Sequence, residues 1–328
     1  MSDFVDRFGR VHKDLRVSLT DKCNLRCTYC MPSEQMLWLP SASVLSAAEM
    51  LRVIRIAVEH GIEEVRLTGG EPLLHPNLVD IVASISALPQ APKIAVTTNA
   101  VRLAPIAQDL VEAGLQRFNI SLDTLDRERF RQLTRRDELD AVLAGIAAAK
   151  STGLKPIKIN AVLMPGVNEH EAPALLRWAL SEGLQLRFIE EMPLNIDHHW
   201  SRQNYVSTDA VIALLQQEFT LNELPRDPHS PAFEMAVVGT DQTVGFISSV
   251  SKPFCGGCDR LRLTADGQFR NCLFAREEHD LRSLLRADAT DEDLFQRMME
   301  SVRAKKAGHG IDNPDFMQPQ RSMHAIGG

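Results

Sequence analysis

Short runs of β-branched and aliphatic residues alternate with longer segments rich in Ala, Leu and Glu over about the first 190 residues. This alternation is typical of repeated βα units built around a parallel sheet. The predicted strands are residues 15–19, 64–67, 93–97, 117–121, 157–162 and 186–189. These units predict an α/β fold with an incomplete parallel (βα)6 barrel of the TIM type.

Helices are predicted between these strands, at residues 46–60, 103–113, 139–152 and 171–182. Each of them ends just before a glycine, which is the residue that most often follows the last turn of a helix. Ser46 begins the first of them, and Glu49 follows at the spacing of a capping box. Core packing alone explains the apolar positions of these helices.

The βα rhythm weakens after residue 200. One more helix is predicted at residues 207–219, followed by an antiparallel pair of strands at residues 236–238 and 243–247. We therefore expect a barrel domain at residues 1–232 and a smaller C-terminal α+β extension at residues 233–328.

Unusual residues follow the predicted strands, which is where a barrel of this type builds its active site. The loop with Cys23 follows the first strand, and the turn with Gly69 and Gly70 follows the second. Later strands also end in polar residues, and the fifth carries Lys158. Each feature alone can be an ordinary strand end, but together they favour a binding site at one end of the barrel.

All the cysteines fall into two triplets: Cys23, Cys27 and Cys30 near the start, and Cys255, Cys258 and Cys272 near the end. Three soft thiolates on one loop can hold three irons of a cubane cluster and leave the fourth iron without a protein ligand. Structural zinc is the alternative for both triplets, although each lacks the fourth ligand that closes a zinc tetrahedron. Disulfides are a weaker alternative, because three neighbouring thiols cannot all pair.

Composition and charge limit the partners of the chain. With 44% hydrophobic and 24% charged residues, it has the composition of an ordinary globular protein. Its net charge of −7 gives no general attraction to nucleic acid or to an anionic membrane, so any anionic ligand must be held by a local group of Arg and Lys. No apolar run approaches the roughly 20 residues that span a bilayer, and the first residues lack the apolar segment of a signal peptide. We expect a cytoplasmic protein that acts on a small molecule.

The first triplet has the spacing CxxxCxxC, with Tyr29 before its last cysteine, and resembles the signature of the radical S-adenosylmethionine enzymes. The resemblance implies that S-adenosylmethionine binds the open iron of a [4Fe–4S] cluster through its amino and carboxylate groups. One electron from the cluster then cleaves the sulfonium to a 5'-deoxyadenosyl radical. The Gly-Gly-Glu-Pro segment at residues 69–72 matches the turn that hydrogen-bonds the methionyl amine in these enzymes.

From Arg16 to the terminal Gly327-Gly328, the chain resembles one family of this superfamily, the GTP 3',8-cyclases of molybdenum cofactor biosynthesis. The resemblance implies a second [4Fe–4S] cluster on the second triplet, whose open iron holds the guanine base. The implied substrate contacts are Arg16, Arg66, Thr97, Lys158, Arg260 and Arg262. The implied contacts with S-adenosylmethionine are Tyr29, Gly70, Ser121 and Met192.

The resemblance also implies the reaction and the partners. The radical takes the hydrogen from C3' of the GTP ribose, the C3' radical adds to C8 of guanine, and a further electron and proton give (8S)-3',8-cyclo-7,8-dihydroguanosine 5'-triphosphate. The residues implied in catalysis are the first triplet, Arg260, Arg262, Gly327 and Gly328. The implied partners are an electron donor such as flavodoxin or ferredoxin, the cyclic pyranopterin monophosphate synthase that takes the product, and a second copy of the chain in a homodimer.

Two other functions remain as alternatives. One is a twin-cluster radical S-adenosylmethionine enzyme that modifies a peptide or a protein; such enzymes usually carry a more cysteine-rich C-terminal extension and lack the pair Arg260 and Arg262. Alternate residues of a strand share one face, so these two guanidiniums are expected to point the same way. The other alternative, from a different class, is a non-catalytic binding module stapled by zinc.

Overall fold

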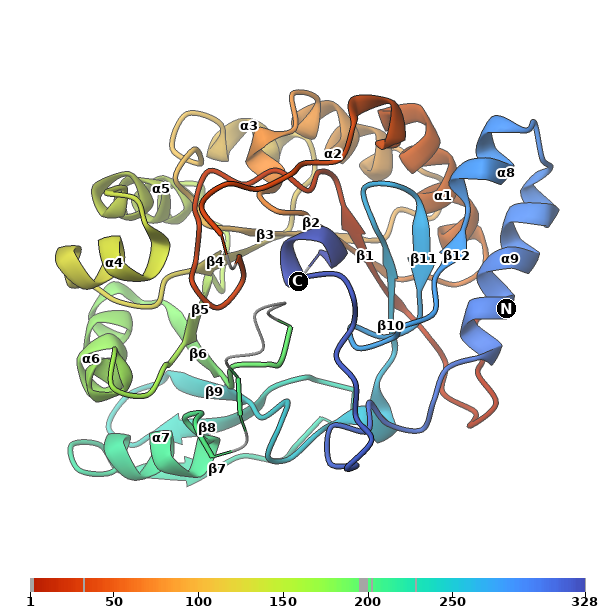
Figure 1. The fold of residues 1–328 in the computed structure, drawn as a ribbon. Coiled ribbons are helices and arrows are strands. Elements are labelled where there is room, and N and C mark those ends of the chain that lie inside the picture. The colour runs from red at the N-terminus through yellow and green to blue at the C-terminus, as the bar shows by residue number, and fades with distance from the viewer. Residues whose placement is uncertain (1–2, 32, 195–199, 202, 228, 328) are drawn as a thin grey trace.

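A computed structural model describes residues 3–31, 33–194, 200–201, 203–227 and 229–327. Within these residues, twelve strands form one sheet in the order β12-β11-β10-β1-β2-β3-β4-β5-β6-β9-β8-β7. The sheet curves around a central space, and helices cover its outer side (Figure 1). The predicted α/β fold with an open barrel is confirmed.

The six predicted parallel strands are all present: β1 (Asp14–Ser18), β2 (Glu64–Thr68), β3 (Lys93–Thr98), β4 (Arg117–Ser121), β5 (Lys158–Val162) and β6 (Gln185–Ile189). Two strands from the C-terminal part of the chain extend this parallel array, which the sequence did not indicate. β10 (Arg260–Leu263) pairs with β1, and β9 (Thr243–Ile247) pairs with β6. The parallel array therefore runs without a break from β10 through β1–β6 to β9.

Antiparallel strands complete both edges of the sheet. The predicted antiparallel pair is confirmed as β8 (Phe233–Val237) and β9, and β7 (Leu221–Glu223) continues that edge. At the other edge, β11 (Gln268–Arg270) and β12 (His279–Asp280) follow β10. Strands from beyond residue 232 thus belong to the same sheet as the earlier strands, and the division of the chain at that residue stays a prediction.

The helices follow the prediction in part. The predicted helices are α1 (Ala47–Glu59), α5 (Leu139–Ser151), α6 (Ala172–Glu182), α7 (Thr208–Leu215) and a shorter α3 (Ala107–Glu112), because residues 103–106 form turns. The capping box is confirmed, since the Ser46 side chain accepts from the Glu49 amide and the Ser46 amide donates to the Glu49 carboxylate. The helices that the sequence did not predict are α2 (Leu78–Ser86), α4 (Arg127–Thr134), α8 (Arg282–Arg286), α9 (Asp291–Arg303) and α10 (Met323–Ile326). In the described residues, every helix falls short of the combination of length and apolar character that a bilayer crossing requires.

The two faces of the curved sheet differ in polarity. On β1, Leu15 and Val17 are fully buried in the core between the sheet and the helices, while Asp14 and Arg16 alternate with them on the inner face. The interior of a TIM barrel is normally filled with branched apolar side chains. A polar inner wall therefore indicates that a ligand, and not packing, fills the interior of this barrel.

The glycine turn after β2 fixes the position of the loop that carries the first cysteine triplet. The Gly70 amide donates to the Thr20 carbonyl at 2.6 Å, and the Glu71 amide donates to the Lys22 carbonyl at 2.8 Å. A Cβ atom at Gly70 would lie 2.4 Å from the Lys22 carbonyl oxygen, so no larger residue fits there without moving the backbone. The glycines are thus needed first for the close approach of two loops of the chain itself.

We predict that Gly70→Ala displaces the first cysteine loop, because the added methyl group meets backbone oxygens that cannot rotate away. Iron analysis after anaerobic reconstitution is then expected to fall from about eight irons per chain to about four, the content of one cluster. Gly256→Ala is the matched control, since a Cβ atom there meets nothing within 4 Å although it lies in the second cysteine loop. Full iron content in Gly70→Ala would contradict the prediction.

Candidate active site

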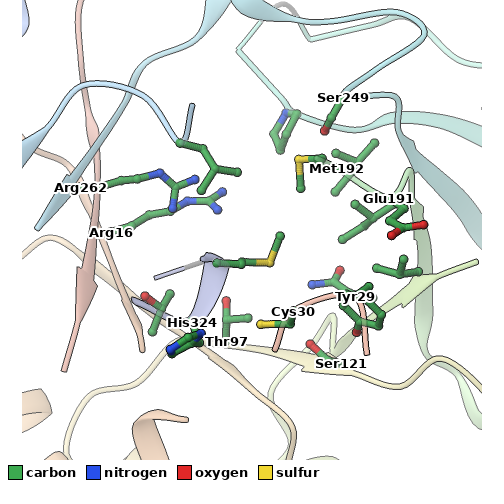
Figure 2. Close-up of a pocket in the computed structure, with 18 of the residues that line it drawn as sticks. Arg16, Tyr29, Cys30, Thr97, Ser121, Glu191, Met192, Ser249, Arg262 and His324 are labelled. Carbon is green, nitrogen blue, oxygen red and sulfur yellow. The ribbon is translucent and has the colours of Figure 1, made fainter. Parts of the chain in front are cut away.

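One cavity at the carboxyl ends of the parallel strands brings the two cysteine triplets together. Other predicted site residues that line it are Arg16, Tyr29, Arg66, Gly70, Thr97, Ser121, Met192, Arg260 and Arg262. Figure 2 shows Arg16 and Arg262 at one side of this cavity, with Tyr29, Cys30 and Ser121 near one another elsewhere on its wall. Lys158 and Gly327 are not part of the lining, and Gly328 lies outside the described residues.

The first triplet lies on the loop that follows β1 and is anchored to the end of α4. The Arg26 amide donates to the Thr134 carbonyl, and the Thr28 amide donates to the Leu133 carbonyl, both at 2.9 Å. Cys23 Sγ accepts from the Leu25 amide at 3.4 Å and from the Asn99 side chain at 3.7 Å. Such N–H···S contacts are typical of thiolate ligands, whose negative charge they stabilise.

Tyr29 is held by the carboxyl group of Asp123, which follows β4. Its hydroxyl donates to Asp123 Oδ2 at 2.8 Å, and the other oxygen of Asp123 accepts from the Val162 amide at 2.9 Å. Burial raises the pKa of Asp123 to about 6. Tyr29 is thereby fixed between the first triplet and the ends of β4 and β5, next to the cavity.

The second triplet lies on two segments that flank β10 and β11. Cys255 and Cys258 belong to the turn before β10, and Cys272 follows β11. All the cysteines are half-buried free thiols. Arg10 fixes the turn from outside the cavity, since its guanidinium donates to the Cys255 carbonyl at 2.8 Å.

Three arginines form a row across adjacent strands of the inner wall. Arg16 on β1 is the register partner of Arg262 on β10 and of Arg66 on β2. The guanidiniums of Arg16 and Arg262 accordingly lie side by side in Figure 2. Arg66 is balanced by Glu64 at 2.6 Å and by Asp14 at 3.6 Å. The other two have no carboxylate within 4 Å among the residues the structure describes.

Several buried donors of the arginines that line the cavity have no partner in the described part of the chain. They are Arg16 Nε, Arg66 Nε, Arg260 Nε and Arg260 Nη2. Buried guanidinium donors without a partner are costly unless an anion accepts from them. The wall is therefore suited to a ligand with several negative charges, and arginine is the side chain best shaped to bind phosphate oxygens in pairs.

Arg187 belongs to the same wall, although the sequence reasoning missed it. It is buried on β6, where it donates to Asn160 at 2.9 Å and to Asn119 at 2.8 Å. Burial and the neighbouring cations lower its pKa to about 9, which still leaves it charged at neutral pH. A lone arginine between Leu186 and Phe188 was the available signal, because a strand that alternates in this way turns the arginine away from the core.

Lys158 lies near Arg187 on the inner wall, outside the cavity lining. Burial, and then the charges of Arg187 and Arg117, lower its pKa to about 8. Its register partners are Asn119 on β4 and Gln185 on β6. Lys158 therefore adds a positive charge to the wall at neutral pH, and a substantial fraction of it is deprotonated at mildly alkaline pH.

The C-terminal segment enters the central space of the barrel, where α10 lies in Figure 1. The Gly327 carbonyl accepts a hydrogen bond from the Arg262 guanidinium. A Cβ atom at Gly327 would lie 2.8 Å from Thr68 Oγ1 and 2.9 Å from Ser18 Cβ, so only glycine fits between the ends of β1 and β2. The imidazole of His324 on α10 meets the Trp38 ring edge-on, with 6.0 Å between the ring centroids.

The donor sets fit two iron–sulfur clusters better than single metal ions. Each triplet offers three soft ligands at the cavity, and thiolates of one cubane each bind a different iron. Among the described residues, no group of three or more His, Cys, Asp and Glu side chains is arranged so that it could hold one metal ion. The zinc alternative would need such a group.

Cys258 of the second triplet differs in acidity from the thiols of the first triplet. Burial raises the pKa of Cys23 to about 11 and that of Cys30 to about 12. Burial also acts to raise the pKa of Cys258, but Arg260 and Lys305 beside it lower it further, to about 7. Because iron binds thiolates, loading of the first triplet must release protons.

Comparison with known proteins identifies related sequences over the whole chain. Residues 17–179 match the Radical SAM superfamily, and residues 184–311 match Molybdenum Cofactor Synthesis C. A GTP 3',8-cyclase of Mycobacterium sp. (strain KMS) is 53% identical over 327 residues, which are 99% of this chain and 93% of the relative. A GTP 3',8-cyclase of Streptomyces coelicolor is 51% identical over 99% of this chain and 96% of the relative.

Solved structures agree on the fold. SuiB of Streptococcus suis bound to S-adenosylmethionine has a TM-score of 0.57 at 16% identity and covers 88% of this chain and 68% of that one. The structure of anSMEcpe with bound AdoMet has a TM-score of 0.57 at 13% identity and covers 88% of this chain and 82% of that one. Likeness at such low identity shows the fold alone. From the sequence relatives, the chain belongs to the radical S-adenosylmethionine superfamily and, within it, to the family of GTP 3',8-cyclases.

Proposed function

We propose that this protein is a GTP 3',8-cyclase that converts GTP to (8S)-3',8-cyclo-7,8-dihydroguanosine 5'-triphosphate, the first step of molybdenum cofactor biosynthesis. The observation that carries the proposal is a group of guanidiniums in the cavity that holds both cysteine triplets: Arg16, Arg260 and Arg262, which have no carboxylate within 4 Å among the described residues. A nucleoside triphosphate supplies the anion that this wall lacks. The names of the close relatives agree with this assignment.

The inner wall would hold the triphosphate and the ribose. Arg16 and Arg262 can each donate two parallel hydrogen bonds to phosphate oxygens, and Arg260 beside them has two donors free. Arg66 and Thr97 extend the wall along β2 and β3, and Lys158 and Arg187 add cations from β5 and β6. The role of this wall would be to orient the ribose, which matters because a carbon radical reacts with whatever hydrogen it meets first.

The first triplet holds a [4Fe–4S] cluster, and the turn at Gly70 with Tyr29, Ser121 and Met192 would hold S-adenosylmethionine. Together these two groups supply the 5'-deoxyadenosyl radical when both are bound. The chain itself orients them: Asp123 fixes the Tyr29 hydroxyl, and the glycine turn fixes the cysteine loop.

The second triplet holds the other [4Fe–4S] cluster, beside which the guanine base would bind. Gly327 would keep the Arg262 guanidinium in place through its carbonyl, and the family resemblance assigns Gly328 a role in catalysis. The electron donor would be flavodoxin or ferredoxin, the product would pass to cyclic pyranopterin monophosphate synthase, and the enzyme would work as a homodimer in the cytoplasm. These last assignments are supported by the family resemblance alone.

We expect the reduced protein, incubated without oxygen with S-adenosylmethionine and GTP, to form 5'-deoxyadenosine and a cyclised nucleotide, both measured by mass spectrometry. Cys27→Ala should form neither, because it removes a ligand of the first cluster. Cleavage of S-adenosylmethionine only in the presence of a peptide would contradict the cyclase and favour a peptide-modifying enzyme. A colourless, zinc-containing protein would favour the binding module, whereas about eight irons per chain would exclude it.

Removal of Gly327 and Gly328 is expected to abolish cyclisation, because the Arg262 guanidinium loses its carbonyl acceptor. Iron content and S-adenosylmethionine binding should stay unchanged, since neither glycine is a ligand of a cluster. Met317→Ala, a change at an exposed position in the same C-terminal segment, serves as a control and should keep its activity. Full cyclisation by the shortened chain would refute the role of the glycines.

Binding of GTP near pH 8 should be accompanied by proton uptake at Lys158. At its pKa of about 8 this lysine is about half protonated, and a bound polyanion raises the pKa, so about half a proton enters. Calorimetry in buffers of different ionisation heat, without S-adenosylmethionine, measures this uptake. Lys158→Arg keeps the charge but not the titration, so the difference between the two proteins should be about half a proton at pH 8 and smaller at pH 7. Equal uptake by both would contradict the prediction.

A further inference from the structure

A buried lysine lies behind the second cysteine triplet, on the side away from the cavity. Lys305 follows α9, is 3% exposed and does not line the cavity. Its ammonium group donates to the Arg260 carbonyl at 2.9 Å and to the Cys258 carbonyl at 3.3 Å, and it lies 3.7 Å from Cys258 Sγ. The three N–H donors of an ammonium group thus meet three acceptors, two of them on one cysteine.

This cation has no carboxylate beside it. No Asp or Glu oxygen lies within 4 Å of Lys305 in the described residues. Asp6 is the carboxylate beside Arg10, which contacts the backbone at Lys306 and Ala307. Asp6 is already bound to Arg10 at 2.6 Å and lies 3.7 Å from His12 Nε2. An ammonium group buried without an opposite charge destabilises the folded protein. The nearest group that can carry a negative charge is the Cys258 thiolate.

The surrounding contacts keep Lys305 in this position. Arg10 donates to the carbonyls of Cys255, Lys306 and Ala307, at 2.8, 2.7 and 3.0 Å. It therefore ties the segment after α9 to the turn that carries the second triplet. The position of Lys305 therefore depends on backbone contacts on both sides of it and on the hydrogen bonds of its own ammonium group.

A [4Fe–4S] cluster on three thiolates is negative in both of its usual states, and it gains one more negative charge when it is reduced. A fixed cation close to a ligand sulfur therefore stabilises the reduced state more than the oxidised state, and the effect is large where the dielectric constant is low. We propose that Lys305 is the buried counter-charge of the second cluster and that it raises the reduction potential of that cluster. This inference rests on the second cluster of the proposed function and goes beyond it, because it assigns to a residue outside the cavity control over the electron that the cluster can accept.

The test is a redox titration followed by electron paramagnetic resonance, with dithionite as the reductant. The parent protein carries Cys23→Ala, Cys27→Ala and Cys30→Ala, so that only the second cluster, about four irons per chain, contributes to the signal. Lys305→Met removes the charge with little change in volume, and Lys305→Arg keeps the charge. Lys306→Met is the matched control. Lys306 is the next residue and its side chain is exposed, so this change removes the same charge from the surface.

We expect a lower midpoint potential in Lys305→Met and potentials within error of the parent in Lys305→Arg and Lys306→Met. An unchanged potential in Lys305→Met, or an equal shift in Lys306→Met, overturns the proposal. If Lys305→Met holds no cluster, iron content decides: about four irons in Lys305→Arg supports the counter-charge, and loss of iron there too shows a packing role and overturns it. Failure of the proposed function would appear separately, as absence of the cyclised nucleotide from the unmodified enzyme, with the shift in potential still present.

Discussion

The cost of burying positive charge without opposite charge governs this structure. The inner wall of the barrel holds four buried or half-buried guanidiniums that have no carboxylate within 4 Å among the described residues: Arg16, Arg187, Arg260 and Arg262. Such groups are tolerated when a ligand supplies the missing charge or when the rest of the fold is stable enough to carry the cost. Here the apolar core between the sheet and the helices supplies that stability, and the cavity is left to be neutralised by what it binds.

The pairing of β10 with β1 brings the charged wall and both cysteine triplets to one cavity. It sets Arg262 beside Arg16, and it brings the loop of the second triplet to the same cavity as the loop of the first. The loops that carry the two triplets follow or precede strands of one hydrogen-bonded sheet, so the sheet sets the distance between them. The family relationship to GTP 3',8-cyclases gives this arrangement a substrate.

Local signals explain what the sequence could predict. Hydrophobic runs and helix-ending glycines located the six barrel strands and most of the long helices, and cysteine spacing located both triplets, because each of these signals lies within a few residues. Long-range pairing leaves no such trace. The addition of β9 and β10 to the parallel array could not be predicted. The same holds for the contact between Lys305 and Cys258, which are 47 residues apart in the chain.

The role of the glycine turn at Gly69 and Gly70 could be predicted only in part, because its other role depends on contacts between distant segments. A pair of glycines in the sequence indicates close approach, but not to what, and the structure shows that Gly70 packs on the backbone of the cysteine loop. Arg187 was overlooked although its alternation with Leu186 and Phe188 was visible. Its partners Asn119 and Asn160 lie on two other strands, so its contacts required the folded sheet.

The β1–β10 pair also has a consequence for biosynthesis. Residues 14–17 pair with residues 260–263, so one edge of β1 lacks its partner until most of the polypeptide has left the ribosome. Unpaired strand edges are templates for association with other chains, and pairings between such distant segments form slowly. Production of this protein is therefore expected to depend on chaperones or slow translation, and recombinant yield should improve at low temperature.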